Sequence, residues 1–268
     1  MFYNAKNGII YTDDSCMDYV SFGTGHKKLI IIPGLGEGLR SMKGLALPMA
    51  YMYRIFAKDF RVYIFGSRRT MPQGYTTEDM AADLKNAADI LGIHKADILG
   101  VSQGGMIAQH FAADYPDRVE KLVLAVTTAK ADENVINAVT PWIEMAKQGR
   151  YRDLMTDNFR KMYTEDYLRR NRFMLPFATR FGAPESYDKF IVMANACLSH
   201  DGEEKLTKIT APTFVIGGEK DKITGSDASR IVSDKIKNSR LFMYPQYGHS
   251  LYDEAKDFNQ KVYNFLQN

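Results

Sequence analysis

Short, continuous apolar runs recur along the chain and predict the strands of a buried sheet. They are Leu29–Ile32, Val62–Phe65, Ile98–Val101, Leu122–Val126 and Phe214–Ile216. Each run is apolar throughout rather than at alternate positions, which is typical of strands covered on both faces. Two earlier runs, Gly8–Tyr11 and Met17–Phe22, precede any helical pattern and predict an antiparallel hairpin at the edge of the sheet.

Apolar residues at helical spacing separate these runs. The sets are Met80, Leu84, Ala87 and Leu91; Ala228, Ile231, Val232 and Ile236; and Phe258, Val262 and Phe265. Thr76 and Asp79 form a capping-box pattern at the start of the first set. A last strand is expected at Leu241–Tyr244. Strands that alternate with helices predict an α/β fold with a doubly wound, mostly parallel sheet.

One long segment interrupts the alternation. Residues 129–207 have a mainly helical pattern, whereas residues 1–128 and 208–268 carry the strand pattern. We therefore expect a two-part core and an inserted helical lid over the carboxyl edge of the sheet, where open α/β sheets bind their ligands. The segment is rich in methionine and aromatic residues. Those expected to line an apolar substrate pocket are Trp142, Met145, Phe159 and Phe177. The alternative is that these side chains form the interior of the lid itself.

Composition narrows the functional classes. The 268 residues are 45% hydrophobic and 25% charged, with a formal net charge of +3 and no long run of like charges, so nucleic acid is not an expected partner. Two distant cysteines provide neither a disulfide framework nor metal-ligand spacing. The sequence contains neither a signal-peptide pattern nor an apolar stretch of about 18 residues. We expect a cytoplasmic enzyme that needs no metal or cofactor, has no membrane partner and acts on a small acyl substrate.

The segment Gly100-Val101-Ser102-Gln103-Gly104 gives the sharpest chemical signal. The pattern G-x-S-x-G is weak alone, but here a buried strand precedes it and a helical pattern follows, as a nucleophile elbow requires. The two glycines would relieve crowding in a strained turn that exposes the Ser102 hydroxyl. The backbone N–H of Gln103, at the start of the helix, is a predicted oxyanion donor.

A second glycine-rich loop follows the first buried strand of the parallel set. The sequence Pro33-Gly34-Leu35-Gly36-Glu37-Gly38 fits neither the dinucleotide pattern nor the Walker pattern of phosphate binding. We predict instead that the backbone N–H of Leu35 is the second oxyanion donor.

A base and an acid should complete this site. Among the five histidines, His249 is the predicted base, because it lies in a glycine-containing loop after the last expected strand. His200, at the end of the helical segment, is the alternative. Asp221, in the loop after Phe214–Ile216, is the predicted acid that orients the imidazole. Glu219 is the alternative acid.

On these residues the chain resembles the α/β-hydrolase superfamily. The order Ser102, Asp221, His249 is the order of that family, Pro33-Gly34-Leu35-Gly36 stands where its oxyanion loop does, and residues 100–104 match its elbow. The similarity covers nearly the whole chain and is nearest to small bacterial esterases, lactonases and carbon–carbon bond hydrolases with helical lids. After the strand expected at Val62–Phe65, relatives often have Asp-x-Arg-Gly, whereas this chain has Phe65-Gly66-Ser67-Arg68-Arg69.

The resemblance implies a cofactor-independent hydrolase with an acyl-serine intermediate, and our leading prediction is a serine esterase. Three other reactions could use the same triad: acyl transfer to an alcohol or peroxide, lactone hydrolysis, and hydrolysis of a carbon–carbon bond. A binding protein without catalytic activity is the alternative from another functional class.

Overall fold

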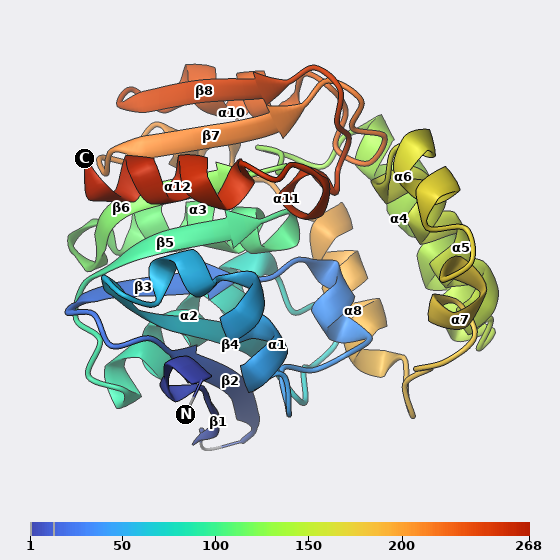
Figure 1. Cartoon of the computed structure of the whole chain (residues 1–268), viewed down its shortest axis with the longest axis horizontal. Helices are drawn as coiled ribbons and strands as arrows, with labels where there is room; N and C mark the ends of the chain where they lie inside the picture. The colour runs from blue at the N-terminus through green and yellow to red at the C-terminus, as the bar shows by residue number, and fades with distance from the viewer. Residues whose placement is uncertain (1, 13) are drawn as a thin grey trace.

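The computed structural model describes residues 2–12 and 14–268, and its centre is one eight-stranded sheet (Figure 1). The strands are β1 (Lys6–Tyr11), β2 (Cys16–Phe22), β3 (Lys27–Ile32), β4 (Phe60–Arg68), β5 (Ala96–Val101), β6 (Val119–Ala125), β7 (Thr213–Gly218) and β8 (Ser239–Tyr244). Their spatial order is β1-β2-β4-β3-β5-β6-β7-β8. Strand β2 is antiparallel to both of its neighbours, β1 and β4, and strands β3 to β8 are mutually parallel. The predicted doubly wound sheet and its edge hairpin are confirmed.

Helices connect the strands. The α-helices are α1 (Ala46–Met52), α2 (Thr77–Ile90), α3 (Gln103–Asp114), α4 (Glu133–Lys147), α5 (Tyr151–Met162), α6 (Glu165–Arg170), α7 (Leu175–Ala178), α8 (Asp188–Leu198), α9 (Glu203–Leu206), α10 (Ala228–Lys235), α11 (Leu251–Glu254) and α12 (Phe258–Gln267). Short 3-10 helices are η1 (Phe2–Asn4), η2 (Leu35–Gly38), η3 (Arg54–Phe56) and η4 (Pro116–Arg118). Within the described residues, none of these helices has the length and apolar character needed to cross a bilayer.

Both faces of the sheet are buried because side chains alternate along each strand. On β3, Leu29 and Ile31 join a cluster with α1 and α12, whereas Ile30 and Ile32 join a cluster with α2, α3 and α10. Figure 1 shows α1 and α12 in front of the sheet and α2 and α3 behind it. This double coverage is the physical reason why the strands are apolar throughout.

The helix patterns are confirmed for α2 and α12 and only in part for α10, which ends at Lys235, before Ile236. Thr76 caps α2 as predicted: its hydroxyl accepts from Asp79 N at 3.1 Å and Asp79 Oδ2 accepts from Thr76 N at 2.8 Å. In α10, Val232 is buried but Ile231 is 47% exposed, so Ile231 does not belong to the buried face. Adjacent residues of a helix point about 100° apart, and α10 is covered on one side only.

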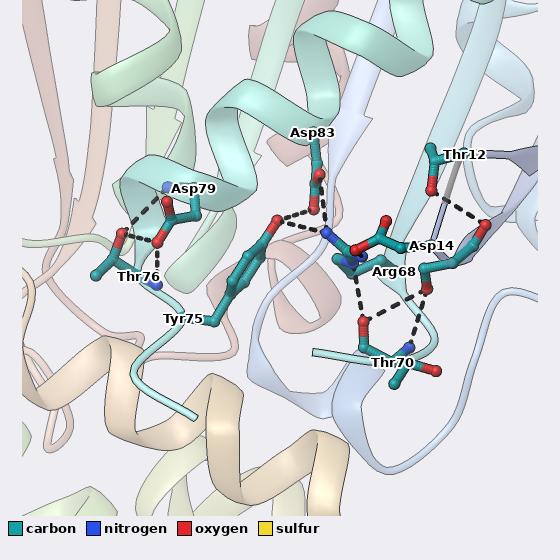
Figure 2. Close-up of polar contacts among 9 residues, drawn as sticks. Thr12, Asp14, Arg68, Thr70, Tyr75, Thr76, Asp79 and Asp83 are labelled. Carbon is teal, nitrogen blue, oxygen red and sulfur yellow. Dashed lines mark hydrogen bonds and ion pairs between the residues drawn. The ribbon is translucent and has the colours of Figure 1, made fainter. Parts of the chain in front are cut away.

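Polar contacts hold the segment at the end of β4 and just after it. Arg68 Nη2 lies 2.5 Å from Asp14 Oδ2, and Arg68 Nη1 donates to the Tyr75 hydroxyl at 3.2 Å. That hydroxyl donates to Asp83 Oδ2 on α2 at 2.6 Å, so Arg68 connects β4 to α2 (Figure 2). Arg69 forms a bidentate salt bridge with Asp18 on β2: Nε donates to Oδ2 at 2.9 Å and Nη2 donates to Oδ1 at 2.7 Å. Side-chain contacts therefore fix the position of this segment.

The chain between β6 and β7 forms α4 to α9. In Figure 1, α4 to α8 lie beyond the arrowheads of β5, β7 and β8, and α5, α6 and α7 are farthest from the sheet. Helix α9 instead packs on α3 and α10. Helix α8 packs on η2 and α4, which joins this helical segment to the loop after β3. Helices α4 to α8 therefore lie over the carboxyl edge of the parallel strands.

Candidate active site

Ser102 stands at a strained turn between β5 and α3. Its backbone has φ +55° and ψ −121°, a conformation that residues other than glycine rarely adopt and that typically costs about 1–3 kcal/mol. The neighbouring glycines make the turn possible. A Cβ at Gly100 would lie 2.5 Å from the Gly104 carbonyl oxygen, and one at Gly104 would lie 2.0 Å from the Ile32 carbonyl oxygen. The two glycines of the motif are thus required by close backbone approach.

The structure brings Ser102, His249 and Asp221 into one hydrogen-bonded line. His249 Nε2 lies 2.8 Å from Ser102 Oγ, and His249 Nδ1 lies 2.8 Å from Asp221 Oδ2. These side chains come from β5–α3, the loop after β8 and the loop after β7. A carboxylate at Nδ1 favours the tautomer whose Nε2 accepts a proton. Ser102 is therefore placed to lose its proton to His249.

Asp221 is held by more than the imidazole. It is only 8% exposed, and its Oδ1 accepts from the backbone N–H groups of Ile223 and Thr224 at 2.8 and 3.0 Å. The Thr224 hydroxyl donates to Oδ2 at 2.9 Å. Burial acts to raise the pKa of Asp221, but His249 and the two amides outweigh it and lower the pKa below its ordinary value. The carboxylate therefore stays ionised beside the imidazole.

The alternative base and acid lie in other contacts. His200 is buried, and its Nδ1 lies 3.0 Å from the Thr77 hydroxyl on α2. Burial lowers the pKa of His200 to about 3, so it stays neutral. Glu219 forms an ion pair with Arg230. Neither residue lines the cavity next to Ser102.

Two helix starts adjoin Ser102. Leu35 is the first residue of η2 and Gln103 the first of α3, so their backbone N–H groups have no acceptor within their own helices. A Cβ at Gly34 would lie 3.1 Å from Ser102 Cβ, which places the Leu35 loop directly against the serine. This arrangement can accept an oxyanion between the two N–H groups.

Side-chain ties that the sequence did not reveal hold this loop and the elbow. The fully buried Gln103 side chain donates from Nε2 to the Met193 carbonyl oxygen on α8 at 2.6 Å. Glu37 in η2 is 4% exposed and pairs through Oε1 with Lys189 Nζ on α8 at 2.7 Å. Burial raises the pKa of Glu37, although Lys189 opposes the rise. No local pattern links residues so far apart in sequence, so only the fold could identify these pairs.

A cavity of about 500 Å³ opens above Ser102. Trp142 and Phe159, two of the predicted pocket residues, line it, whereas Met145 and Phe177 do not. Met145 instead packs against the buried core. Phe177 is 71% exposed, because α7 turns this side of the chain to the outside. Aromatic content indicated a pocket in this segment but did not specify which helix faces point inward.

Arg40 is the one arginine or lysine among the described residues that line the cavity. Its side chain is exposed and makes no ion pair within the described chain, in contrast to Glu37, the acidic residue of the lining, which pairs with Lys189. Burial raises the pKa of the phenol of Tyr151, another lining residue, and the positive charge of Arg40 opposes this rise. Arg40 and Tyr151 therefore share one side of the cavity. No three His, Cys, Asp or Glu side chains of the described residues converge as a metal site requires.

Comparisons with known proteins agree with this architecture. A sequence model for the alpha/beta hydrolase fold matches residues 27–256. The 2-hydroxy-6-oxononadienedioate/2-hydroxy-6-oxononatrienedioate hydrolase 2 of Pseudomonas putida is 28% identical over 268 residues, covering 95% of this chain and 92% of the relative. The corresponding hydrolase of Burkholderia vietnamiensis is 26% identical, covering 93% and 90%.

Solved structures share the fold. An alpha/beta hydrolase enzyme from a Medee basin deep-sea metagenome library superimposes with a TM-score of 0.83 at 24% identity, covering 97% of this chain and 98% of that one. The enol-lactonase of Burkholderia xenovorans LB400 gives a TM-score of 0.83 at 21% identity, covering 97% and 100%.

Proposed function

Since this chain belongs to the alpha/beta hydrolase fold family, we propose that it is a serine hydrolase that cleaves a small carboxylic ester. The observation that carries the proposal is the line from Ser102 Oγ through His249 to Asp221, with both contacts at 2.8 Å. A hydroxyl, an imidazole and a buried carboxylate in this relation form the constellation that activates serine for attack on a carbonyl carbon.

The first half-reaction forms an acyl-enzyme. His249 Nε2 takes the proton of Ser102 as Oγ bonds to the carbonyl carbon, and the carbonyl oxygen becomes an oxyanion that Leu35 N–H and Gln103 N–H hold. The ionised Asp221 stabilises the imidazolium. As the tetrahedral intermediate collapses, the ester C–O bond breaks and His249 returns the proton to the leaving alcohol. Removing one such oxyanion donor typically slows a reaction by about 10²–10³.

The second half-reaction releases the acid. Water takes the place of the alcohol, His249 removes a proton from it, and its oxygen attacks the acyl carbon. Collapse breaks the bond to Ser102 Oγ, which recovers its proton from His249. No metal or cofactor enters this sequence. We further propose that α4 to α8 act as a lid, because Trp142 and Phe159 from two of these helices line the cavity above Ser102.

A second candidate is hydrolysis of a carbon–carbon or enol-lactone bond next to a carbonyl group. The names of the curated relatives favour it, since their substrates carry a ketone and two carboxylates. Arg40, at the cavity and without an anionic partner among the described residues, supports a substrate with a carboxylate. Product analysis distinguishes the candidates. An ester yields an acid and an alcohol, a carbon–carbon substrate yields an acid and a second product with a new C–H bond, and an enol-lactone yields one ring-opened acid.

A panel of p-nitrophenyl esters of increasing acyl length tests the proposal. We expect turnover of short acyl chains that Ser102→Ala abolishes, with a limit on length set by a cavity of about 500 Å³. Full activity of Ser102→Ala would refute the proposed nucleophile. Turnover of vinylogous diketo acids without turnover of any ester would replace the first candidate by the second.

A further inference from the structure

The outermost part of the helical segment carries an exposed apolar face. Phe173, Met174, Phe177 and Phe181, which we call the tip face, are 79, 70, 71 and 60% exposed. Backbone bonds from residue i+4 to residue i, such as Ala178 N to Met174 O and Phe181 N to Phe177 O, continue through both turns around α7. The three phenylalanines are therefore spaced four residues apart on one side of a helical stretch.

Two of the large side chains of the tip face lie against each other. The rings of Phe177 and Phe181 have centroids 5.0 Å apart. In Figure 1, α7 lies at the margin of the molecule, remote from the sheet. Single exposed apolar residues are ordinary, but clustered large ones mark a surface that contacts something.

The stretch of chain that carries this face is positively charged. Residues 167–184 contain the arginines 169, 170, 172 and 180 and no acidic residue. All four arginines are exposed, and the Arg172 guanidinium lies 4.8 Å from the centre of the Phe173 ring. Arg169 is paired with Asp166, which precedes the stretch, and the other three guanidiniums make no ion pair with the described residues. The partner of the tip face should therefore be both apolar and anionic.

These properties select among partners. A second copy of this chain, related by a two-fold axis at the tip face, would place four arginines opposite four arginines, which is repulsive. The surface of an anionic bilayer offers what the face requires, because exposed aromatic side chains enter the region between headgroups and acyl chains while arginines bind the phosphates. We propose that the tip face docks this protein on the surface of an anionic lipid bilayer.

Docking would bring the cavity to the lipid surface. Phe181 belongs to the tip face and also lines the cavity above Ser102, as does Gly182. A small apolar molecule dissolved in the bilayer would then lie beside the cavity rim. The docking proposal itself does not rest on the proposed hydrolysis, because binding can be measured without turnover.

Co-sedimentation of the whole protein with vesicles tests the proposal. We expect binding to vesicles of phosphatidylcholine with phosphatidylglycerol and far less to phosphatidylcholine alone. The variant with Arg172→Gln and Arg180→Gln should bind the anionic vesicles about 25-fold less, at roughly fivefold for each arginine. The variant with Phe173→Ser and Met174→Ser should bind at least about tenfold less.

A matched control replaces exposed apolar residues elsewhere. Leu47 and Ile90 are 59 and 57% exposed, and the variant with Leu47→Ser and Ile90→Ser should bind as the unaltered protein does. Near-UV circular dichroism checks that every variant is folded. Equal binding to neutral and anionic vesicles, no binding at all, or an unchanged Phe173→Ser and Met174→Ser variant would each overturn the proposal. A dimer in solution that the Phe173→Ser and Met174→Ser variant dissociates would also overturn it.

Discussion

Replacing Asp221 by asparagine tests the proposed role of the buried acid with almost no change in shape. Asparagine can keep its oxygen toward the N–H groups of Ile223 and Thr224, which now donate to Oδ1 at 2.8 and 3.0 Å. Its NH₂ group then faces His249 Nδ1 and donates to it. The imidazole proton moves to Nε2, so that His249 can no longer accept the proton of Ser102.

The opposite orientation of the asparagine is unfavourable. Its NH₂ group would face two buried backbone donors, and each donor left without an acceptor costs about 1–3 kcal/mol. The wrong tautomer therefore dominates. In triads of this kind the same substitution lowers kcat by about 10⁴, equivalent to about 5 kcal/mol of lost transition-state stabilisation.

The assay is hydrolysis of a short p-nitrophenyl ester near pH 7.5, with folding checked by circular dichroism. Asp221→Asn should lower kcat by about 10³–10⁴ with KM nearly unchanged. Glu219→Gln is the matched control, since Glu219 pairs with Arg230 outside the triad, and it should change kcat by less than about twofold. A folded Asp221→Asn variant that keeps a tenth of the activity, or an equal loss in Glu219→Gln, would refute this reasoning.

Three further predictions concern stability and substrate preference. Burial raises the pKa of Asp97, at the start of β5, to about 7. Between about pH 4 and 7 the native state then binds more protons than the unfolded chain. The free energy of unfolding should therefore fall by up to about 4 kcal/mol as pH rises through that range. Denaturant titrations of Asp97→Asn should lack this fall. Lys189→Met leaves Glu37 buried without its cation, so urea unfolding at pH 8 should show that the free energy of unfolding has fallen by about 3–5 kcal/mol. The value of kcat should also fall, because the Leu35 loop is released. An unchanged urea midpoint would contradict the role of this pair. Arg40→Met should lower kcat/KM for p-nitrophenyl hemisuccinate by about tenfold relative to p-nitrophenyl butyrate, whereas Arg152→Met, which removes an exposed charge outside the cavity lining, should leave that ratio unchanged.

Local patterns predicted the sheet well because they report local causes. Continuous apolar runs marked strands covered on both faces, and the Thr76 capping box appeared where α2 begins. The elbow was visible because its strain requires glycine at Gly100 and Gly104, close to the serine in sequence. Such constraints are recorded within a few residues of the chain.

The parts that were missed depend on distant contacts. The bond from Gln103 to Met193 and the pair of Glu37 with Lys189 join segments that only the folded chain brings together. Phe177 was placed in the pocket from its residue type, but the direction in which α7 faces depends on packing between helices. Ile231 was assigned to a buried face from its helical spacing, but which side of α10 is covered also depends on packing. Sequence periodicity gives the spacing of the residues on one face of a helix, but it does not show which part of the protein that face contacts.

The central claim is that Ser102 is the nucleophile. Reaction with a fluorophosphonate, followed by peptide mapping with mass spectrometry, measures this directly. The account predicts one adduct per chain, located on Ser102 and absent from both Ser102→Ala and unfolded protein. An adduct on another residue, or equal labelling of Ser102→Ala, would contradict it.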